Sequence, residues 1–190
     1  MFGSHVVATE TGTMSSHGDW TDTPKNSSEE AWGLLCDALE TLLPVAEEQD
    51  VILALETYVG NVLKTQGQLT GLLGRFPTQH LQVVCDPYNY LSSDLMSVQE
   101  RATNELLDRF EPHFVLAHLK DVSPDGARAG TPEFGTGVFS QGPYLEFLRT
   151  RRPDLDLIAE HLPLEQLPAV RRRVEELPTP VESPEASGVS

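Results

Sequence analysis

Val51-Ile52-Leu53-Ala54-Leu55-Glu56 is an apolar run that ends on a carboxylate, and the chain repeats this pattern three more times. The later runs are Leu81 to Cys85 before Asp86, Phe114 to Ala117 before His118, and Leu155 to Ala159 before Glu160. Apolar runs of this length are typical of parallel strands buried on both faces. Helical patterns separate the runs, so the sequence predicts alternating strands and helices around a parallel sheet.

The residues that end these runs are the candidate functional residues. Parallel strands present their carboxyl ends at one rim of the sheet, which is where α/β folds place their active sites. Glu56, Asp86, His118 and Glu160 are therefore expected to converge at that rim. Asp86 before Pro87 also fits a simple turn, and His118 also fits a buried core histidine. The convergence of all four favours a site for Mn²⁺, Mg²⁺ or Co²⁺.

The rest of the chain extends the same repeat. A first strand is expected over residues 5–9, ending at Glu10, and a long polar loop follows over residues 14–28. A helix capped by Ser27 or Ser28 comes next, and Pro44 is expected to kink, end or restart it. Its predicted buried stripe is Trp32, Leu35, Leu39, Leu42 and Leu43. Later helices are expected after Thr65, over residues 95–110, around Tyr144, and over residues 164–177.

Five strand and helix units define the expected fold class. The sequence predicts an α/β fold of the (β/α)8 barrel type that holds five of the eight units, a partial barrel. One domain is expected over residues 1–177. Residues 178–190 are rich in Pro, Ser and Glu, and they predict a disordered acidic tail.

Composition narrows the classes of partner. The formal net charge of −16 disfavours binding to nucleic-acid phosphates. No apolar stretch approaches the roughly 20 residues that a membrane span needs. Cys36 and Cys85 fall in predicted helix and strand patterns, which favours reduced core thiols. These features, and the absence of a signal-peptide pattern after Met1, predict a cytoplasmic protein.

Several motifs together resemble the sugar phosphate isomerase/epimerase superfamily, whose members have a xylose isomerase-like barrel. The match spans about residues 5–165, and its motifs are Leu53-Ala54-Leu55-Glu56, Val84-Cys85-Asp86-Pro87-Tyr88-Asn89, Ala117-His118-Leu119-Lys120-Asp121, Gly135-Thr136-Gly137 and Ile158-Ala159-Glu160. The resemblance implies that the strands before Glu56, Asp86, His118 and Glu160 are strands five to eight. Strands one to three would then be missing, so we expect a fragment. Open sheet edges would make it prone to self-association as a homo-oligomer.

The resemblance also implies roles for individual residues. Glu56, Asp86, His118 and Glu160 match the metal ligands, with Mn²⁺ favoured, and Glu56 and Glu160 match the acid/base pair of the 3-epimerases. Lys120 is expected to polarise a substrate oxygen or bind a phosphate. Asn89, Asp121 and Glu10 are the other candidate contacts to a small sugar substrate. Asn89 stands where many members of the family have His, which weakens the specific expectation of ketose 3-epimerase activity.

Three functions are open at this stage. The leading one is a metal-dependent sugar isomerase or epimerase that works through an enediolate-type intermediate. An endonuclease-IV-like phosphodiesterase is the second, although it would need more histidine ligands and His-x-Asn-Asp in place of His118-Leu119-Lys120-Asp121. The third is an inactive truncated remnant or a sugar-binding protein.

Overall fold

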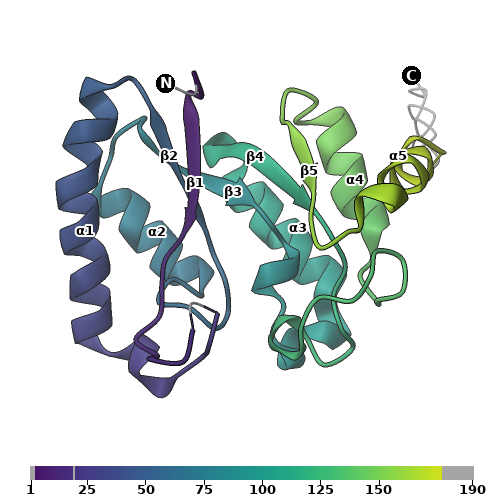
Figure 1. Cartoon of the computed structure of the whole chain (residues 1–190), viewed down its shortest axis with the longest axis horizontal. Helices are drawn as coiled ribbons and strands as arrows, with labels where there is room; N and C mark the ends of the chain where they lie inside the picture. Colours follow the sequence, from purple (N-terminus) through teal and green to yellow (C-terminus); the bar gives the residue numbers. More distant parts are fainter. Residues whose placement is uncertain (1–2, 19, 177–190) are drawn as a thin grey trace, which may run out of the picture.

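Five parallel strands form the centre of the molecule, and their order in the sheet is their order in the sequence. The structure is a computed structural model that describes residues 3–18 and 20–176. Each strand pairs in parallel with the next, and the sheet curls into a half-barrel with α1 to α4 on its outer side (Figure 1). The strands are β1 (Val6–Glu10), β2 (Ile52–Glu56), β3 (Leu81–Cys85), β4 (Phe114–Leu119) and β5 (Leu157–Ala159). The predicted partial barrel of five units is confirmed.

One helix follows each strand. The helices are α1 (Glu29–Glu48), α2 (Gln66–Arg75), α3 (Gln99–Phe110), α4 (Gln141–Thr150) and α5 (Leu167–Glu176). The Ser28 hydroxyl accepts a hydrogen bond from the backbone N–H of Ala31 and so begins α1. Thr65 and Gln68 form a reciprocal capping box at the start of α2. The predicted tail over residues 178–190 lies outside the described residues.

Two expectations for α1 need correction. The helix does not end at Pro44 but runs through it to Glu48, and a kink at Pro44 stays a prediction. Pro44 and Glu40 are both exposed, so water can hydrate the Glu40 carbonyl that would otherwise accept a hydrogen bond from position 44. Leu42 was expected in the buried stripe but is 47% exposed, whereas Leu39 and Leu43 are buried. The buried stripe is therefore narrower than predicted.

The edge strands differ from the central ones. Residues of β2 to β4 are largely buried, as predicted. Strand β5 is only three residues long and leaves Leu157 and Ile158 partly exposed, and Val7 in β1 is half exposed. The prediction of a buried strand over residues 155–159 is therefore wrong. β1 and β5 are the two edge strands of the sheet. Each pairs with a neighbouring strand on one side only, and no strand of the described chain pairs with its other side.

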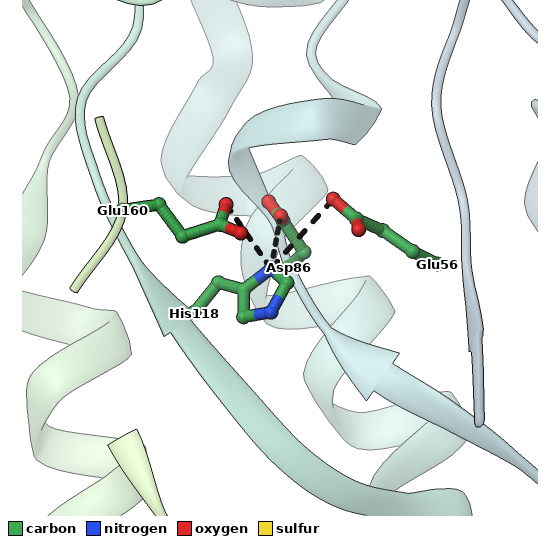
Figure 2. A group of neighbouring side chains, drawn as sticks. All are labelled: Glu56, Asp86, His118 and Glu160. Atoms are coloured by element: carbon green, nitrogen blue, oxygen red, sulfur yellow. Dashed lines mark hydrogen bonds and ion pairs between the residues drawn. The ribbon is translucent and has the colours of Figure 1, made fainter. Parts of the chain in front are cut away.

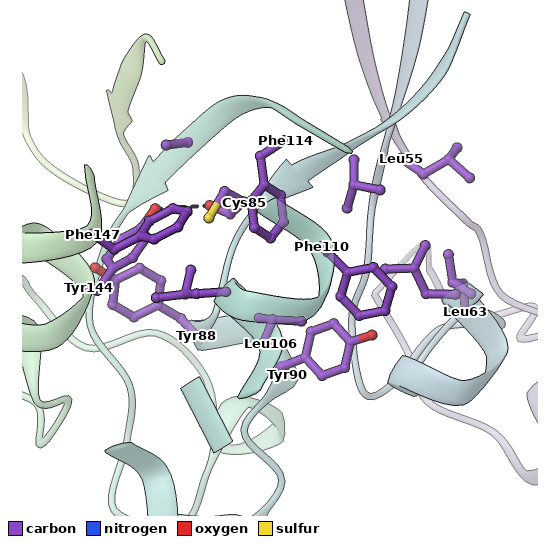
Figure 3. Close-up of a cluster of buried hydrophobic side chains, with 14 of the residues drawn as sticks. Leu55, Leu63, Cys85, Tyr88, Tyr90, Leu106, Phe110, Phe114, Tyr144 and Phe147 are labelled. Carbon is purple, nitrogen blue, oxygen red and sulfur yellow. Dashed lines mark hydrogen bonds between the residues drawn. The ribbon is translucent and has the colours of Figure 1, made fainter. Parts of the chain in front are cut away.

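The hydrophobic core fills the space between the sheet and the helices. Figure 3 shows aromatic side chains from several elements meeting there, including Tyr88, Phe114, Tyr144 and Phe147. The Tyr144 hydroxyl lies 2.9 Å from the Cys85 carbonyl and 2.8 Å from the His118 carbonyl. Tyr144 thus links α4 to the carboxyl ends of β3 and β4, where the candidate site begins. Cys36 and Cys85 are both buried free thiols, as predicted.

Candidate metal centre and active site

The four strand-end residues converge, as the sequence predicts. Glu56 ends β2, Asp86 directly follows β3, His118 is the second-to-last residue of β4, and Glu160 directly follows β5. One ligand atom from each of the four lies within 4.8 Å of the others. Figure 2 shows the three carboxylates and the imidazole pointing toward a common centre. The parallel register of the sheet produces this convergence, because it aligns the carboxyl ends of neighbouring strands.

His118 faces all three carboxylates through one nitrogen. Its Nδ1 lies 3.1 Å from Asp86 Oδ2, 3.3 Å from Glu160 Oε2 and 3.6 Å from Glu56 Oε1. Burial by itself would lower the pKa of His118, but hydrogen bonds to Asp86 and Glu56 and the carboxylate charges outweigh it and raise the pKa to about 9. In the metal-free protein His118 is therefore a cation at neutral pH.

Lys120 is a second cation inside the cluster. Its Nζ lies 2.7 Å from Asp86 Oδ2 and 2.9 Å from Glu160 Oε2, and its side chain is only 3% exposed. Burial opposes its charge, but the carboxylates of Asp86 and Glu160 outweigh that effect and raise the pKa of Lys120 above the usual lysine range. Burial likewise opposes ionisation of Asp86, yet Lys120 and His118 hold its pKa below the usual range. Asp86, His118 and Lys120 are thus all charged at neutral pH in the metal-free protein.

Asn89 organises two members of the cluster from one short 3-10 turn, η2 (Tyr88–Tyr90). Its backbone N–H donates to Asp86 Oδ1 at 3.1 Å, and its side-chain amide donates to Glu56 Oε1 at 2.6 Å. Asn89 also lines the cavity beside the cluster. The structure therefore shows Asn89 orienting Glu56, and the substrate contact predicted for Asn89 stays a prediction.

Asp121 orders the loop that follows β4. Its Oδ1 accepts hydrogen bonds from the backbone N–H groups of Val122 and Phe139, and its Oδ2 accepts from those of Gly135 and Gly137. Gly135 has a φ of +84°, a backbone conformation that favours glycine. The Gly-x-Gly motif and Asp121 thus form one structural unit beside the site. The Asp121 carboxylate is hydrogen-bonded by four backbone N–H groups. The substrate contact predicted for Asp121 stays a prediction.

A cavity of about 350 Å³ opens directly onto the cluster. Glu56 and Glu160 line it, whereas Asp86 and His118 are buried and are not among its lining residues. Sequence reasoning missed several wall residues. They are Trp20 from the polar loop after β1, Tyr58, Thr131 and His161. The rings of Trp20 and Tyr58 meet edge to face with centroids 5.4 Å apart.

The structure gives His161 and Glu10 settings that the sequence did not indicate. His161 has a φ of +54°, which is uncommon for a residue other than glycine and often marks functional backbone. Its position directly after Glu160 is the sequence feature that could have indicated His161 as a cavity residue. Glu10 ends β1, accepts a hydrogen bond from Asn61 Nδ2 at 3.3 Å, and lines a different cavity, beside α1. Its predicted substrate contact stays a prediction.

The donor set fits a divalent cation. Ligands at about 2.1 Å from an octahedral ion lie about 3 Å from their neighbours, and the Nδ1 of His118 lies 3.1 to 3.6 Å from the three carboxylate oxygens. Three oxygen donors with one imidazole suit Mg²⁺ or Mn²⁺ better than a structural zinc site. Glu56, Asp86, His118 and Glu160 are the residues that would hold the ion.

The fold and this cluster define a class of barrel protein. The family model of the xylose isomerase-like TIM barrel matches residues 2–175, so the chain belongs to this family. A search of curated proteins finds no significant match to the sequence. None of the helices within residues 3–18 and 20–176 is both long and apolar enough to cross a membrane.

Solved structures share the fold at low sequence identity. The 3-keto-D-glucoside 4-epimerase YcjR from E. coli is 16% identical with a TM-score of 0.64, and the match covers 90% of this chain and 63% of that one. The probable 3-DHS dehydratase AsbF from Bacillus anthracis is 13% identical, with a TM-score of 0.63 and coverage of 90% and 62%. A xylose isomerase-like protein from Mycobacterium smegmatis, in complex with magnesium, is 15% identical, with a TM-score of 0.57 and coverage of 92% and 60%. The chain spans about three fifths of the length of these structures.

Proposed function

We propose that this site belongs to a metal-dependent isomerase or epimerase of small sugars, in which Glu56 and Glu160 transfer the proton. The observation that carries the proposal is the exposure of the ligands. Only Glu56 and Glu160 among the four line the cavity, with side chains 12% and 27% exposed. Proton transfer at carbon requires carboxylates that reach the substrate, and the buried Asp86 and His118 do not.

The two glutamates are suited to opposite halves of the reaction. They come from β2 and β5, on either side of Asp86 and His118 (Figure 2). One carboxylate takes the proton from the carbon next to the carbonyl, which leaves an enediolate. The other returns a proton to that carbon on the opposite face; in an isomerisation the proton goes to the neighbouring carbon instead, and the hydroxyl proton passes to the former carbonyl oxygen. A divalent ion held by the cluster supplies Lewis-acid polarisation of the carbonyl. We infer Mn²⁺ as the preferred ion, with Mg²⁺ or Co²⁺ as substitutes.

The remaining residues support this chemistry. Lys120 reaches the cavity from the cluster and is placed to donate to a substrate oxygen. The Asn89 amide fixes the orientation of Glu56. The solved epimerase with the same fold acts on a sugar according to its name, which supports a sugar substrate for this chain.

The phosphodiesterase alternative finds less support in the described residues. A trinuclear zinc site needs several histidines, and His118 is the one histidine that the described chain brings into the cluster. The third possibility, a sugar-binding or inactive remnant, is an outcome of the activity test below.

Proton exchange provides that test. The chain is incubated in D2O with Mn²⁺ and a panel of ketoses, and deuterium incorporation at the carbon next to the carbonyl is followed by NMR. We expect exchange by the wild-type chain, and a loss of at least 100-fold in Glu56→Gln and in Glu160→Gln. Glu146→Gln, an exposed position on α4, is the matched control and should retain full exchange. Sugar binding without any exchange would overturn the catalytic assignment and leave a sugar-binding protein.

A further inference from the structure

The same three carboxylate oxygens face two different nitrogens. Asp86 Oδ2, Glu160 Oε2 and Glu56 Oε1 each lie within 4 Å of His118 Nδ1, and the same three oxygens lie within 4 Å of Lys120 Nζ. The Lys120 distances are 2.7, 2.9 and 3.7 Å respectively. An ammonium has three donors and no lone pair, so it can balance these oxygens but cannot join His118 as a ligand.

Lys120 is built into this position. It directly follows β4 and lies two residues after His118, so both side chains point to the same face of the extended chain. The Lys120 carbonyl accepts a hydrogen bond of 2.9 Å from Gln141 Nε2, and the Tyr88 hydroxyl in turn donates to Gln141 Oε1 at 2.8 Å. Tyr88 and Lys120 are both buried. The backbone that carries the ammonium is therefore fixed from the core.

The positive charge of Lys120 also bears on metal binding. Three carboxylates this close together, one of them fully buried, would repel one another without a cation, and Lys120 offsets part of that charge in the metal-free protein. A divalent ion that binds through Asp86 Oδ2 and Glu160 Oε2 needs the two oxygens that Lys120 contacts most closely. The ammonium and the ion therefore compete for the same lone pairs.

We propose that Lys120 is an internal cation that competes with the divalent ion, so that it assembles the site without metal and sets the metal affinity. When an ion binds, the ammonium gives up its contacts and turns toward the cavity that it already lines. The inference rests on the proposed function only for the existence of the metal site. Its test requires no turnover, so a failure of sugar chemistry leaves it standing.

Calorimetric titration with Mn²⁺ tests the competition. We expect Lys120→Met to bind Mn²⁺ at least tenfold more tightly than the wild-type chain. Lys64→Met is the matched control, because Lys64 Nζ contacts the Ser27 hydroxyl outside the cluster, and its affinity should equal that of the wild type. Binding by Lys120→Met alone would also support the proposal. Equal or weaker binding by this variant, or no binding by either protein, would overturn it.

A second measurement on the wild-type chain decides the matter if Lys120→Met does not fold. The sequence contains three lysines, Lys25, Lys64 and Lys120, so acetylation can be followed at each by peptide mass spectrometry. Without metal, Lys120 should be protected relative to the other two because it is buried and ion-paired. Saturating Mn²⁺ should raise its labelling several-fold and leave Lys25 and Lys64 unchanged. Labelling of Lys120 that does not respond to Mn²⁺ would overturn the proposal.

Discussion

The side-chain amide of Asn89 donates a hydrogen bond of 2.6 Å to Glu56 Oε1. This is the shortest side-chain contact of Glu56 in the cluster, since Lys120 and His118 lie 3.7 and 3.6 Å from the same oxygen. Asn89 thus orients the carboxylate that we assign to proton transfer. It does so from a turn whose own backbone N–H is bound by Asp86.

Replacing Asn89 with Ala should lower the rate of proton exchange by about tenfold or more, because a hydrogen bond to a charged group contributes about 1.5–3 kcal/mol. The backbone contact to Asp86 does not depend on the side chain, so the free energy of unfolding should change much less than the rate. Exchange kinetics and thermal unfolding measure the two effects separately. Asn104→Ala, an exposed position on α3, is the control. An unchanged exchange rate in Asn89→Ala would show that Glu56 needs no such orientation.

The stability of the metal-free protein should fall between pH 6.5 and 9. The folded protein raises the pKa of His118 from 6.5 to about 9, so the folded state binds a proton that the unfolded state releases. This contribution is complete below pH 6.5 and is lost as pH rises through 9. A shift of this size corresponds to a contribution on the order of 3 kcal/mol. Urea unfolding in the presence of a chelator, at several pH values, measures it.

The variant His118→Gln separates the contribution of His118 to the pH dependence of stability from the contributions of other titrating groups. His118→Gln lacks the titrating imidazole, so its stability should be lower than that of the wild type at pH 6 and should vary less between pH 6.5 and 9. Asp86 adds a loss at the acid end, because its lowered pKa makes the folded state release a proton that the unfolded state retains near pH 4. Parallel curves for the two proteins above pH 6.5 would contradict the assignment to His118.

The sequence predicted the centre of the site because its residues end recognisable strands. Glu56, Asp86 and His118 follow apolar runs. Parallel pairing brings the carboxyl ends of such strands to one rim of the sheet, independent of the conformation of the loops. The same reasoning places Glu160 correctly although β5 is short and partly exposed. Strand ends are therefore predictable even where the burial of a strand is not.

The walls of the cavity were not predictable in the same way. Trp20 lies in a polar loop, and its contact with Tyr58 joins segments 38 residues apart without any periodic pattern. His161 reaches the cavity through a positive φ that no sequence pattern indicates for histidine. Asp121 was expected near substrate, but its carboxylate is directed to backbone N–H groups of residues 14 to 18 positions later. Contacts of this kind depend on loop conformation, which local propensity does not determine.

Trp20 should contribute to sugar binding but little to stability. Its side chain is part of the cavity wall and the residue is 52% exposed, so Trp20→Ala removes a ring that can pack on a sugar while burying little in the core. We expect the dissociation constant for a bound ketose to rise about tenfold, with an unfolding free energy within about 0.5 kcal/mol of the wild type. Calorimetry and urea unfolding measure the two quantities. Equal sugar affinity in both proteins would remove Trp20 from the binding site.

Gly137 should not tolerate even one added carbon. A Cβ at this position would overlap the Asp121 carboxylate and the Val122 carbonyl, and Asp121 holds the loop through four backbone donors. Gly137→Ala is therefore expected to lower the free energy of unfolding by about 3 kcal/mol, through overpacking and weakened hydrogen bonds. Gly142→Ala is the matched control, because an added Cβ there meets no atom within 4 Å. Urea midpoints that coincide for the two variants would show that the loop yields to the added carbon, and that Asp121 does not hold it rigidly beside the site.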